Sequence, residues 1–300
     1  MQLLSRLNPD QKDKVLTLIE LATSFDGINP FAEHVLLHLE HGGDLVDQHL
    51  VVEEDNQIFA YAHIDATDQV LGPSVEMVVE PSQRNRGIGK QVLEKVIKEF
   101  GTNIRLWSHG ELDSAKKLAE SFGFEKVRTV IQMRRNLDNL PKLPRVDFKV
   151  RTFLPGLDDL AWLELNRKVF KTHPEQGRWK EKDLSIRISE DWFDAAGFFL
   201  VEEDQQIIAF CWTKIHSHSH IDNKHHQIGE LYITGVDSEY EGKGLGKFLT
   251  ILGMQHLARK GLHQVLLYTD LENDRAIRLY EKLGFAEISR DVMYKKAKIN

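Results

Sequence analysis

The chain repeats itself once, and this duplication constrains the fold more than any other feature. The segment VEEDNQIFAY (52–61) returns as VEEDQQIIAF (201–210), and LAESFGF (118–124) returns as LYEKLGF (279–285). Between these pairs, a glycine-rich stretch around Gly87 returns around Gly244. The pairs keep their order, and the separation between partners grows slowly along the chain. Such a long period indicates a duplicated domain with small loop insertions, not a short-repeat solenoid.

The join between the two copies is predicted in NLDNLPKLPRV (136–146). This stretch has two prolines, two asparagines and no sustained hydrophobic period, which is typical of a linker. We therefore expect an N-terminal domain over 1–140 and a C-terminal domain over 146–300. A chain of 300 residues has the length for two domains of ordinary size.

Both copies show the same order of predicted elements. In the N-terminal copy we expect a helix opened by Pro9, strands over 49–54, 57–64 and 75–79, a helix through 92–100, a strand over 103–107, a helix over 113–122 and a final strand over 124–133. In the C-terminal copy we expect a helix over 156–170, strands over 198–203, 206–215 and 228–236, a helix over 244–259, a strand over 264–269, a helix over 273–283 and a final strand over 285–294. This order predicts a mixed α/β sheet covered by helices, with each copy closed by its own last strand.

Composition excludes several classes of protein. The net charge of −7 and the pI near 6.1 argue against a nucleic-acid partner held through phosphates. No apolar run is long enough to span a bilayer, and the first residues lack the pattern of a signal peptide. The single cysteine, Cys211, fits a reducing compartment and a place in a strand core. We expect a cytoplasmic monomer that acts on a small molecule, without membrane or nucleic-acid contacts.

The stretch ELYITGVDSEYEGKGLGKFL (230–249) joins a predicted strand to a predicted helix through a glycine-rich turn, a common phosphate-binding arrangement. It does not match the P-loop pattern G-x-x-x-x-G-K-[ST], because Lys247 is followed by Phe248. It does not match the dinucleotide pattern G-x-G-x-x-G either, because Gly242, Gly244 and Gly246 are evenly spaced. What remains is R-x-x-G-x-G from Arg84 and E-x-x-G-x-G in the second copy.

With this turn, the chain resembles the GCN5-related N-acetyltransferases (GNAT), whose signature is [Q/R]-x-x-G-x-[G/A] between a strand and a helix. The segment NDRAIRLYEKLGF (273–285) strengthens the resemblance. It implies two tandem GNAT-like α/β domains, each a mixed, mostly antiparallel sheet flanked by helices, and acetyl-CoA as co-substrate. Glu241 departs from the signature, which removes one side-chain contact to phosphate but leaves the backbone cradle.

The resemblance assigns coenzyme contacts to both copies. In the C-terminal copy they fall on Thr234, Gly235, Val236, Glu241, Gly242, Lys243, Gly244, Leu245, Gly246, Lys247, Asn273, Asp274, Arg275, Ala276, Ile277 and Arg278. In the N-terminal copy they fall on Met77, Val78, Val79, Arg84, Asn85, Arg86, Gly87, Ile88 and Gly89.

Acetyl transfer to an amine requires a base, donors that polarise the thioester carbonyl, and an acid for the departing thiolate. Glu230 is a candidate base, because carboxylates are depleted in strands; the alternative is a solvent-facing glutamate. Tyr280 is the candidate acid, because the family places a tyrosine there; the alternative is a core tyrosine. The donors would be main-chain N–H groups near 233–236.

The N-terminal copy lacks these groups. By position along the repeat, Glu230 corresponds to Pro73, Tyr280 to Ala119 and Asn273 to Leu112. We therefore predict that the C-terminal domain is catalytic. The N-terminal domain would be structural, would supply substrate contacts and would retain a coenzyme-like turn.

The blocks HPEQGRW (173–179), WTKIH (212–216) and HVLLHLEHGGD (34–44) resemble a tandem branch of the family more closely. This resemblance implies acetylation of the cysteinyl amine of cysteinyl-glucosaminyl-inositol, which gives mycothiol and CoA. It places substrate contacts on Glu33, Glu175, Lys214, Glu230 and Tyr268. Lys214 as a solvated strand residue and Glu175 as an ordinary loop acid are the plainer readings.

Two other functions stay open from the residues alone. One is a tandem acetyltransferase for another amine, such as an aminoglycoside or a protein N-terminus. The other is a non-catalytic acyl-CoA sensor, which would need neither Glu230 nor Tyr280. The histidines between 216 and 226 are explained by a polar hairpin loop, since no Cys or Asp completes a known metal spacing, and no metal site is predicted.

Overall fold

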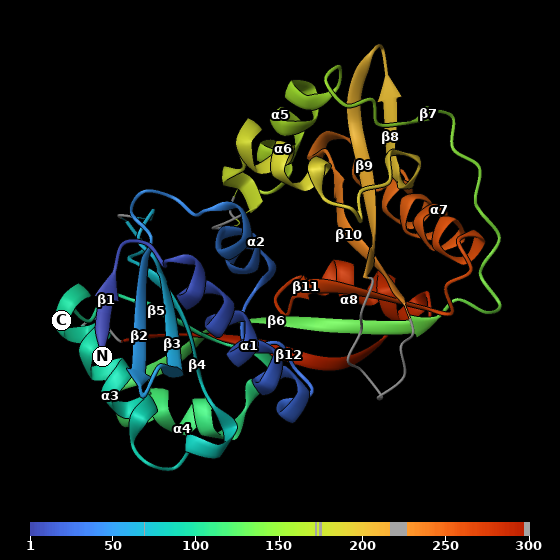
Figure 1. Cartoon of the computed structure of the whole chain (residues 1–300). Coiled ribbons are helices and arrows are strands. Elements are labelled where there is room, and N and C mark those ends of the chain that lie inside the picture. The colour runs from blue at the N-terminus through green and yellow to red at the C-terminus, as the bar shows by residue number, and fades with distance from the viewer. Residues whose placement is uncertain (69, 172, 174–175, 217–226, 297–300) are drawn as a thin grey trace.

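The computed structural model describes residues 1–300 except 69, 172, 174–175, 217–226 and 297–300 (Figure 1). Its N-terminal half contains β1 (Gln2–Leu4), α1 (Pro9–Asp26), α2 (Glu33–His41), β2 (Gln48–Glu54), β3 (Gln57–Asp65), β4 (Ser74–Val79), α3 (Ile88–Phe100), β5 (Arg105–Ser108), α4 (Asp113–Ser121) and β6 (Phe124–Asn136). Its C-terminal half contains β7 (Lys149–Thr152), α5 (Asp159–Val169), α6 (Glu181–Ser189), β8 (Phe198–Glu203), β9 (Gln206–His216), β10 (Ile228–Val236), α7 (Leu245–Arg259), β11 (Gln264–Asp270), α8 (Asp274–Lys282) and β12 (Ala286–Lys296). The predicted elements are therefore present, while α2, α6, β1 and β7 were not predicted.

The duplication is visible in the backbone of the two hairpins. Asp55 and Asn56 join β2 to β3 with φ of 48° and 63°, and Asp204 and Gln205 join β8 to β9 with φ of 48° and 65°. Two consecutive positive φ angles are typical of the tight turns that match strand twist. Both hairpins also carry a bulge at the same place, after Val52 and after Val201. The repeat in the sequence is thus a repeat of conformation.

All strands belong to one sheet of 12 strands, in the order β1-β2-β3-β4-β5-β12-β6-β11-β10-β9-β8-β7. The pairs β4–β5 and β10–β11 are parallel, and the other neighbours are antiparallel. The last strand of each half lies in the other half: β12 pairs with β5, and β6 pairs with β11. The two exchanged strands also pair with each other along most of their length, which joins the halves at the centre of the sheet (Figure 1).

The prediction that each copy is closed by its own last strand is therefore wrong. In a duplicated chain both final strands have similar patterns, and either half offers an equivalent open edge. Local sequence does not determine which of the two sheet edges a final strand pairs with. The same ambiguity underlies domain swapping. The exchange reaches into the cores: Ile131 and Met133 of β6 are buried in the C-terminal core, and Val292 and Tyr294 of β12 are buried in the N-terminal core.

Each half of the sheet is covered by helices on both faces. In the N-terminal half, α1 and α2 pack on one face through Val15 and Val35, and α3 packs on the other through Val92 and Leu93. In the C-terminal half, α5 packs on one face through Trp162, and α7 packs on the other. The predicted fold class, a mixed and mostly antiparallel sheet flanked by helices in each half, is confirmed.

A buried ionic triad ties the exchanged strand to the N-terminal half. Nε2 of His109 lies 3.2 Å from Oε2 of Glu76 on β4, and its Nδ1 lies 3.1 Å from Oδ2 of Asp291 on β12. Asp291 also accepts a hydrogen bond from the backbone N–H of Gly110 at 3.0 Å. Burial alone would lower the pKa of His109, but the two carboxylates raise it to about 10. The imidazole is therefore charged in the folded protein at neutral pH.

We expect this triad to make stability fall as pH rises. The folded-state pKa of His109 lies above its ordinary value of 6.5, so its contribution is full below pH 6.5 and is lost as pH approaches about 10. Urea unfolding at several pH values, for the wild type and for His109→Gln, measures this contribution. The stability difference between the two proteins should shrink across that window. A difference that is independent of pH would contradict a charged His109.

Candidate active site

Two parallel strands of the C-terminal half diverge after a short paired stretch, and we call the region between them the groove. β10 pairs with β11 only at Gly229 and Glu230, although both strands continue beyond that point. On its other side, β10 has a bulge between Leu231 and Ile233 where it pairs with β9. The bulge turns the end of β10 away from β11. The main chain that follows, up to Val236, therefore borders a space that no strand fills.

The glycine-rich turn lies directly after this groove. Gly242 and Gly244 have φ of 79° and 82°, and Gly244 is the N-cap of α7. A Cβ at either glycine would meet nothing within 4 Å, so these positions need glycine for conformation, not for space. Because the first N–H groups of a helix have no partner within the helix, the start of α7 is a site for anionic groups.

Charged and capping side chains surround the turn. Glu241, the departure from the family signature, forms an ion pair with Arg275 at the start of α8. The side chain of Asn273 accepts a hydrogen bond from the N–H of Ala276 at 3.2 Å and caps α8. Lys243 lies over the ring of Tyr240, 4.4 Å from its centre. The segments 241–247 and 273–278 are thus brought together from two separate parts of the sequence.

Glu230 lies at the point where β10 and β11 separate. It is 5% exposed, and its Oε2 lies 2.6 Å from Nε2 of His216. Its partner across the β9–β10 pair is Lys214. A buried carboxylate beside an imidazole and opposite an ammonium group is an arrangement that can accept and pass on a proton.

Lys214 connects the two halves of the molecule. Its ammonium forms an ion pair with Glu33, the first residue of α2 in the N-terminal half. It also lies over the ring of Trp192, 4.3 Å from the ring centre. Burial alone would raise the pKa of Glu33, but the Lys214 and Arg187 cations hold it below its ordinary value. Glu33 is therefore ionised, and the structure brings it beside Lys214 of the C-terminal half. Its role in substrate binding stays a prediction.

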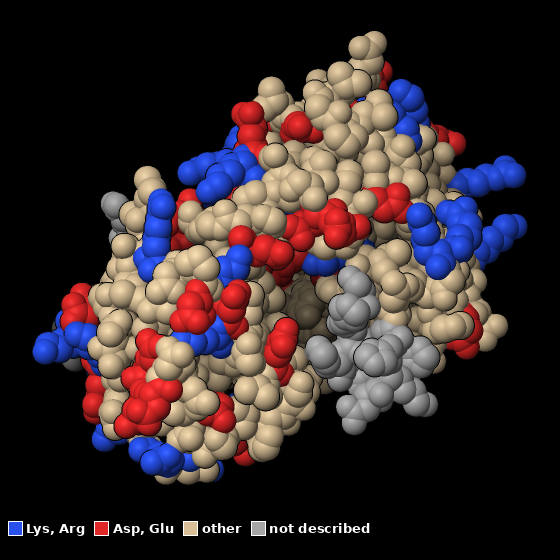
Figure 2. Space-filling model, in the orientation of Figure 1, with Lys and Arg blue, Asp and Glu red and all other residues tan. Residues whose placement is uncertain are grey.

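Tyr268 on β11 completes this cluster. Its hydroxyl accepts a hydrogen bond from Nε2 of Gln132, its cross-strand partner on the exchanged strand β6, at 2.7 Å. Desolvation and then the Glu230 carboxylate raise the pKa of Tyr268. Figure 2 shows a hollow between the two halves with Asp and Glu side chains gathered along its rim. We call the site formed by Glu33, Lys214, Glu230 and Tyr268 the cleft.

Tyr280 lies on α8, apart from the Glu33–Lys214 pair. Its ring packs against the C-terminal core and makes an edge contact with Phe285, with the ring centres 5.8 Å apart. Burial raises the pKa of Tyr280, with a further contribution from Cys211. Cys211 is itself fully buried, and burial raises the pKa of its thiol to about 12. The expectation that Cys211 is a core residue is confirmed.

In the N-terminal half, the positions equivalent to Glu230, Asn273 and Tyr280 carry other residues. The predicted counterpart of Glu230, Pro73, is wrong by one residue because the bulge in β10 has no equivalent in β4; the strand registers place Ser74 there instead. The other two assignments agree with the structure, since Leu112 and Asn273 are both N-cap residues and Ala119 follows in the same helix. The N-terminal half has no carboxylate or tyrosine at these positions.

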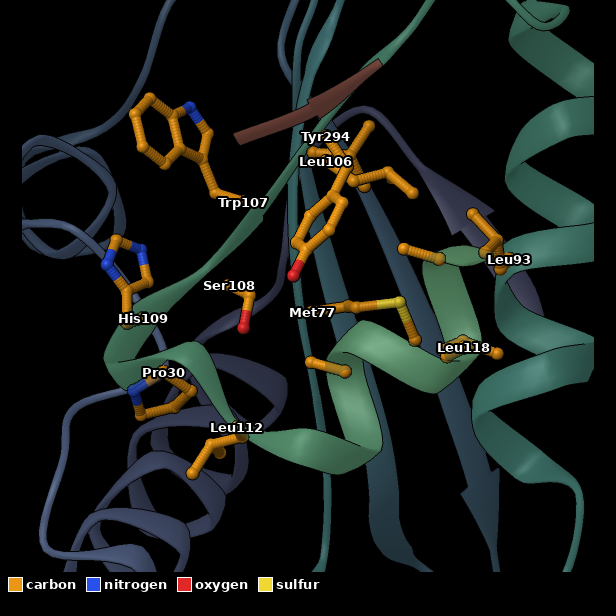
Figure 3. Close-up of a pocket in the computed structure, with 13 residues that line it drawn as sticks. Pro30, Met77, Leu93, Leu106, Trp107, Ser108, His109, Leu112, Leu118 and Tyr294 are labelled. Carbon is orange, nitrogen blue, oxygen red and sulfur yellow. The ribbon is translucent and has the colours of Figure 1, made fainter. Parts of the chain in front are cut away.

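The N-terminal half nevertheless keeps a groove and a turn of the same shape. β4 and β5 pair only at Ser74 and Val75, and an apolar pocket lies beside this divergence, lined by Met77 and closed by Tyr294 of the exchanged strand (Figure 3). Asn85 and Gly87 have φ of 62° and 80°, matching the two glycines of the C-terminal turn. Arg84, however, is paired with Asp26 through two hydrogen bonds of 2.7 Å.

Three residues beside the cleft were not predicted from the sequence: Trp179, Arg187 and Tyr232. The guanidinium of Arg187 lies 3.9 Å from the ring centre of Trp179 and donates a hydrogen bond to the Tyr232 hydroxyl at 2.7 Å. Trp179 and Trp192 were the available signal for a cation site, because aromatic rings often hold cations. Glu175, a predicted substrate contact, lies outside the described residues.

None of the helices that the structure describes is both long and apolar enough to cross a bilayer.

Comparisons with known proteins agree with this architecture. A model described as the acetyltransferase (GNAT) family matches residues 160–285, and one described as an acetyltransferase (GNAT) domain matches residues 46–126. Among solved structures, a GCN5-related N-acetyltransferase from Sphaerobacter thermophilus superposes with a TM-score of 0.67 at 24% identity, covering 96% of this chain and 93% of its own. A tandem GNAT protein from the clavulanic acid biosynthesis pathway gives 0.69 at 16% identity, covering 96% and 95%. The fold and the site define a tandem-domain GNAT acetyltransferase.

Relatives found by sequence indicate which family of tandem GNAT acetyltransferases the chain belongs to. A mycothiol acetyltransferase of Acidothermus cellulolyticus is 43% identical over 305 residues, covering 97% of this chain and 93% of the relative. A mycothiol acetyltransferase of Streptomyces coelicolor is 39% identical over 300 residues, covering 98% and 94%. The chain therefore belongs to the mycothiol acetyltransferase family. The prediction of an acetyltransferase enzyme is confirmed.

Proposed function

We propose that this protein transfers the acetyl group of acetyl-CoA to the cysteinyl amine of cysteinyl-glucosaminyl-inositol, which gives mycothiol and CoA. The proposal is carried by the full-length similarity to mycothiol acetyltransferases, together with the cleft to which both halves contribute charged side chains. The acceptor has an ammonium group and many hydroxyls, and charged side chains in a cleft suit such a molecule.

The coenzyme would lie in the groove between β10 and β11. The positive φ angles at Gly242 and Gly244, and the free N–H groups at the start of α7, support a pyrophosphate contact there. When bound, acetyl-CoA supplies a reactive thioester. Main-chain N–H groups at Thr234–Val236 border the same groove and would polarise its carbonyl. Contacts from 273–278 would close the far side.

Glu230 is the proposed base. Its carboxylate would take a proton from the acceptor ammonium, directly or through a water molecule, so that the free amine can attack the thioester carbonyl. His216, 2.6 Å away, is placed to share that proton. Glu33, Lys214 and Tyr268 would contact the acceptor around this point, as would Glu175.

Tyr280 is the proposed acid. Burial raises the pKa of its hydroxyl, so the group keeps its proton until one is needed. The amine forms a bond to the acetyl carbon, the bond from that carbon to sulfur breaks, and the phenolic proton passes to the CoA thiolate. The nitrogen loses its second proton to solvent, Glu230 releases the first, and the phenolate regains one. The net products are the amide, CoA and one proton.

We further propose that the N-terminal turn holds a second coenzyme molecule without turning it over. The pocket lined by Met77 and the matching φ angles of Asn85 and Gly87 support binding, and the absence of a carboxylate at Ser74 and of a tyrosine at Ala119 argues against catalysis. The domain boundaries at 140 and 146, the cytoplasmic location and the monomeric state remain predictions.

The proposal is tested by assaying the purified chain with acetyl-CoA and a panel of amines. The panel contains cysteinyl-glucosaminyl-inositol, an aminoglycoside and a peptide with a free N-terminus, and acetylated products are measured by mass spectrometry. We expect kcat/KM for the cysteinyl acceptor to exceed the others by about 10²-fold or more, because a polar site discriminates strongly against acceptors that leave its groups unpaired.

The other outcomes separate the alternatives. Equal use of all three amines would reject the cysteinyl acceptor and keep an acetyltransferase. Binding of acetyl-CoA without acetylation of any amine would instead indicate an acyl-CoA sensor.

A further inference from the structure

A cluster of histidines with one aspartate lies in the N-terminal half, away from the cleft residues described above. His38 is on α2, Asp47 directly precedes β2, and His63 is on β3. A nitrogen of each imidazole and an oxygen of the carboxylate all lie within 4.8 Å of one another. Asp47 and His63 are each 1% exposed and His38 is partly buried, so the fold encloses most of the cluster.

The polar atoms of this cluster are incompletely paired. His38 Nδ1 lies 2.9 Å from Asp47 Oδ2, but His63 Nε2 lies 3.9 Å from the same oxygen, which is too far for a hydrogen bond. His63 Nε2 and Asp47 Oδ1 are both buried and have no hydrogen-bond partner. Unpaired buried polar atoms are rare because removing them from water without a partner is unfavourable.

The surroundings favour the metal-binding form of the imidazole. Burial holds the pKa of His63 well below its ordinary value, so the ring is neutral and offers a lone pair. The Tyr61 hydroxyl lies 3.5 Å from Nδ1 of His63. A metal-bound histidine is usually oriented by a hydrogen-bond partner at the ring nitrogen that does not bind the metal. A lone pair at Nε2 facing a carboxylate at 3.9 Å leaves a position that a cation would fill.

Gly43, in the loop beside the cluster, leaves room for the Asp47 carboxylate. A Cβ on Gly43 would lie 2.1 Å from Asp47 Oδ2 and 3.3 Å from His38 Nδ1. Any larger residue at this position would displace the carboxylate from the two imidazoles. The glycine therefore allows three chain segments to bring their side chains to one point.

We propose that His38, His63 and Asp47 bind a divalent transition-metal ion, with Zn²⁺ the best match. Two imidazoles and one carboxylate are a common zinc donor set, and tetrahedral ligands at about 2.0–2.2 Å lie about 3.4 Å from one another. His63 would therefore move toward the carboxylate from 3.9 Å, and His38 would move slightly away from it from 2.9 Å. Binding would displace the proton that His38 and Asp47 share. The sequence analysis considered metal binding only for the histidines of 216–226, which are separate residues.

The position of this site gives the ion a structural role. His38 belongs to α2, whose first residue Glu33 reaches the cleft and whose last residue His41 lies 2.6 Å from Glu190 of the C-terminal half. The ion would fasten α2 to the N-terminal sheet, and α2 in turn contacts the C-terminal half at both ends.

Metal content of the full chain tests the proposal. The wild type and His38→Ala are stripped with a chelator, incubated with Zn²⁺, freed of unbound metal, and measured by mass spectrometry of the element. Because histidines of 216–226 can also retain zinc, the expected result is a difference: the wild type holds one more zinc per chain. His263→Ala is the matched control, since His263 is an exposed histidine outside both groups of possible metal ligands, and the variant should retain the wild-type content.

Two further measurements keep the test independent of folding defects. Gly43→Ala retains all three ligand residues but should displace the Asp47 carboxylate and so lose the same zinc. Circular dichroism checks that both variants are folded. Zn²⁺ should raise the Tm of the wild type more than that of His38→Ala, because an ion that binds only the folded state stabilises it. Equal zinc content in the wild type, His38→Ala and Gly43→Ala, or loss only in His263→Ala, would overturn the proposal.

Discussion

Replacing Glu230 by glutamine should lower kcat by about 10²- to 10⁴-fold, the usual contribution of a general base. The amide has the size of the carboxylate and still hydrogen-bonds His216, but it does not accept a proton from the acceptor ammonium. The measurement is steady-state kcat at saturating acetyl-CoA. Product should be detected by mass spectrometry, because the cysteinyl thiol of the acceptor interferes with reagents that detect free CoA.

A matched substitution separates catalysis from general damage. Glu99 is an exposed carboxylate on α3 that pairs only locally with Lys95 at 2.7 Å, so Glu99→Gln should keep the wild-type kcat. If Glu230→Gln also kept the wild-type kcat, Glu230 would not be the base. A change confined to KM would assign it to acceptor binding instead.

Tyr294→Ala should destabilise the N-terminal half of the molecule, although Tyr294 belongs to the last strand of the chain. The side chain is 3% exposed and lies in the N-terminal core with Val92 and Phe124. Truncating a buried aromatic side chain costs about 3–5 kcal/mol of unfolding free energy. Urea unfolding measures the size of the effect, and amide hydrogen exchange identifies the half that opens.

The location of the lost protection decides between two arrangements of the strands. With the exchange, amides of β5 and α3 should exchange faster than those of α7. Faster exchange in α7 and β11 alone would mean that β12 belongs to the C-terminal half. Ile288→Ala on the same strand is the control, since Ile288 is 40% exposed and its loss should change stability by no more than about 0.5 kcal/mol.

Most single elements of the fold were predictable because local chemistry determines them. The β-rich runs on either side of Asp55-Asn56, and their repeat in the second copy, predicted both hairpins. The apolar face formed by Val92, Leu93 and Val96 predicted α3. The strand exchange was not predictable, because the choice between two equivalent sheet edges depends on contacts between residues far apart in sequence. The helix α2 was missed although Val35 and Leu39 lie on one buried face.

Some contacts of the candidate site could likewise be predicted from the sequence, and others could not. Glu230 and Lys214 lie opposite each other because β9 and β10 form a hairpin with a fixed register, which sequence reasoning can approach. The contact of Lys214 with Glu33 depends on how the two halves meet, and only the family resemblance pointed to it. The bulge at Tyr232 shifted the counterpart of Glu230 from Pro73 to Ser74, because an extra residue in one strand leaves no signature in spacing alone.

The strand exchange also sets the order in which the protein can be completed during synthesis. The N-terminal half leaves the ribosome first, but β5 has to wait for Val292–Lys295 of β12, the last strand of this sheet to be made. Until then its edge stays open, and the half that was made first is the last to be finished. A ribosome that stops early therefore produces two incomplete halves, not one finished domain and one fragment. The two halves of the duplicated chain therefore complete their sheets together.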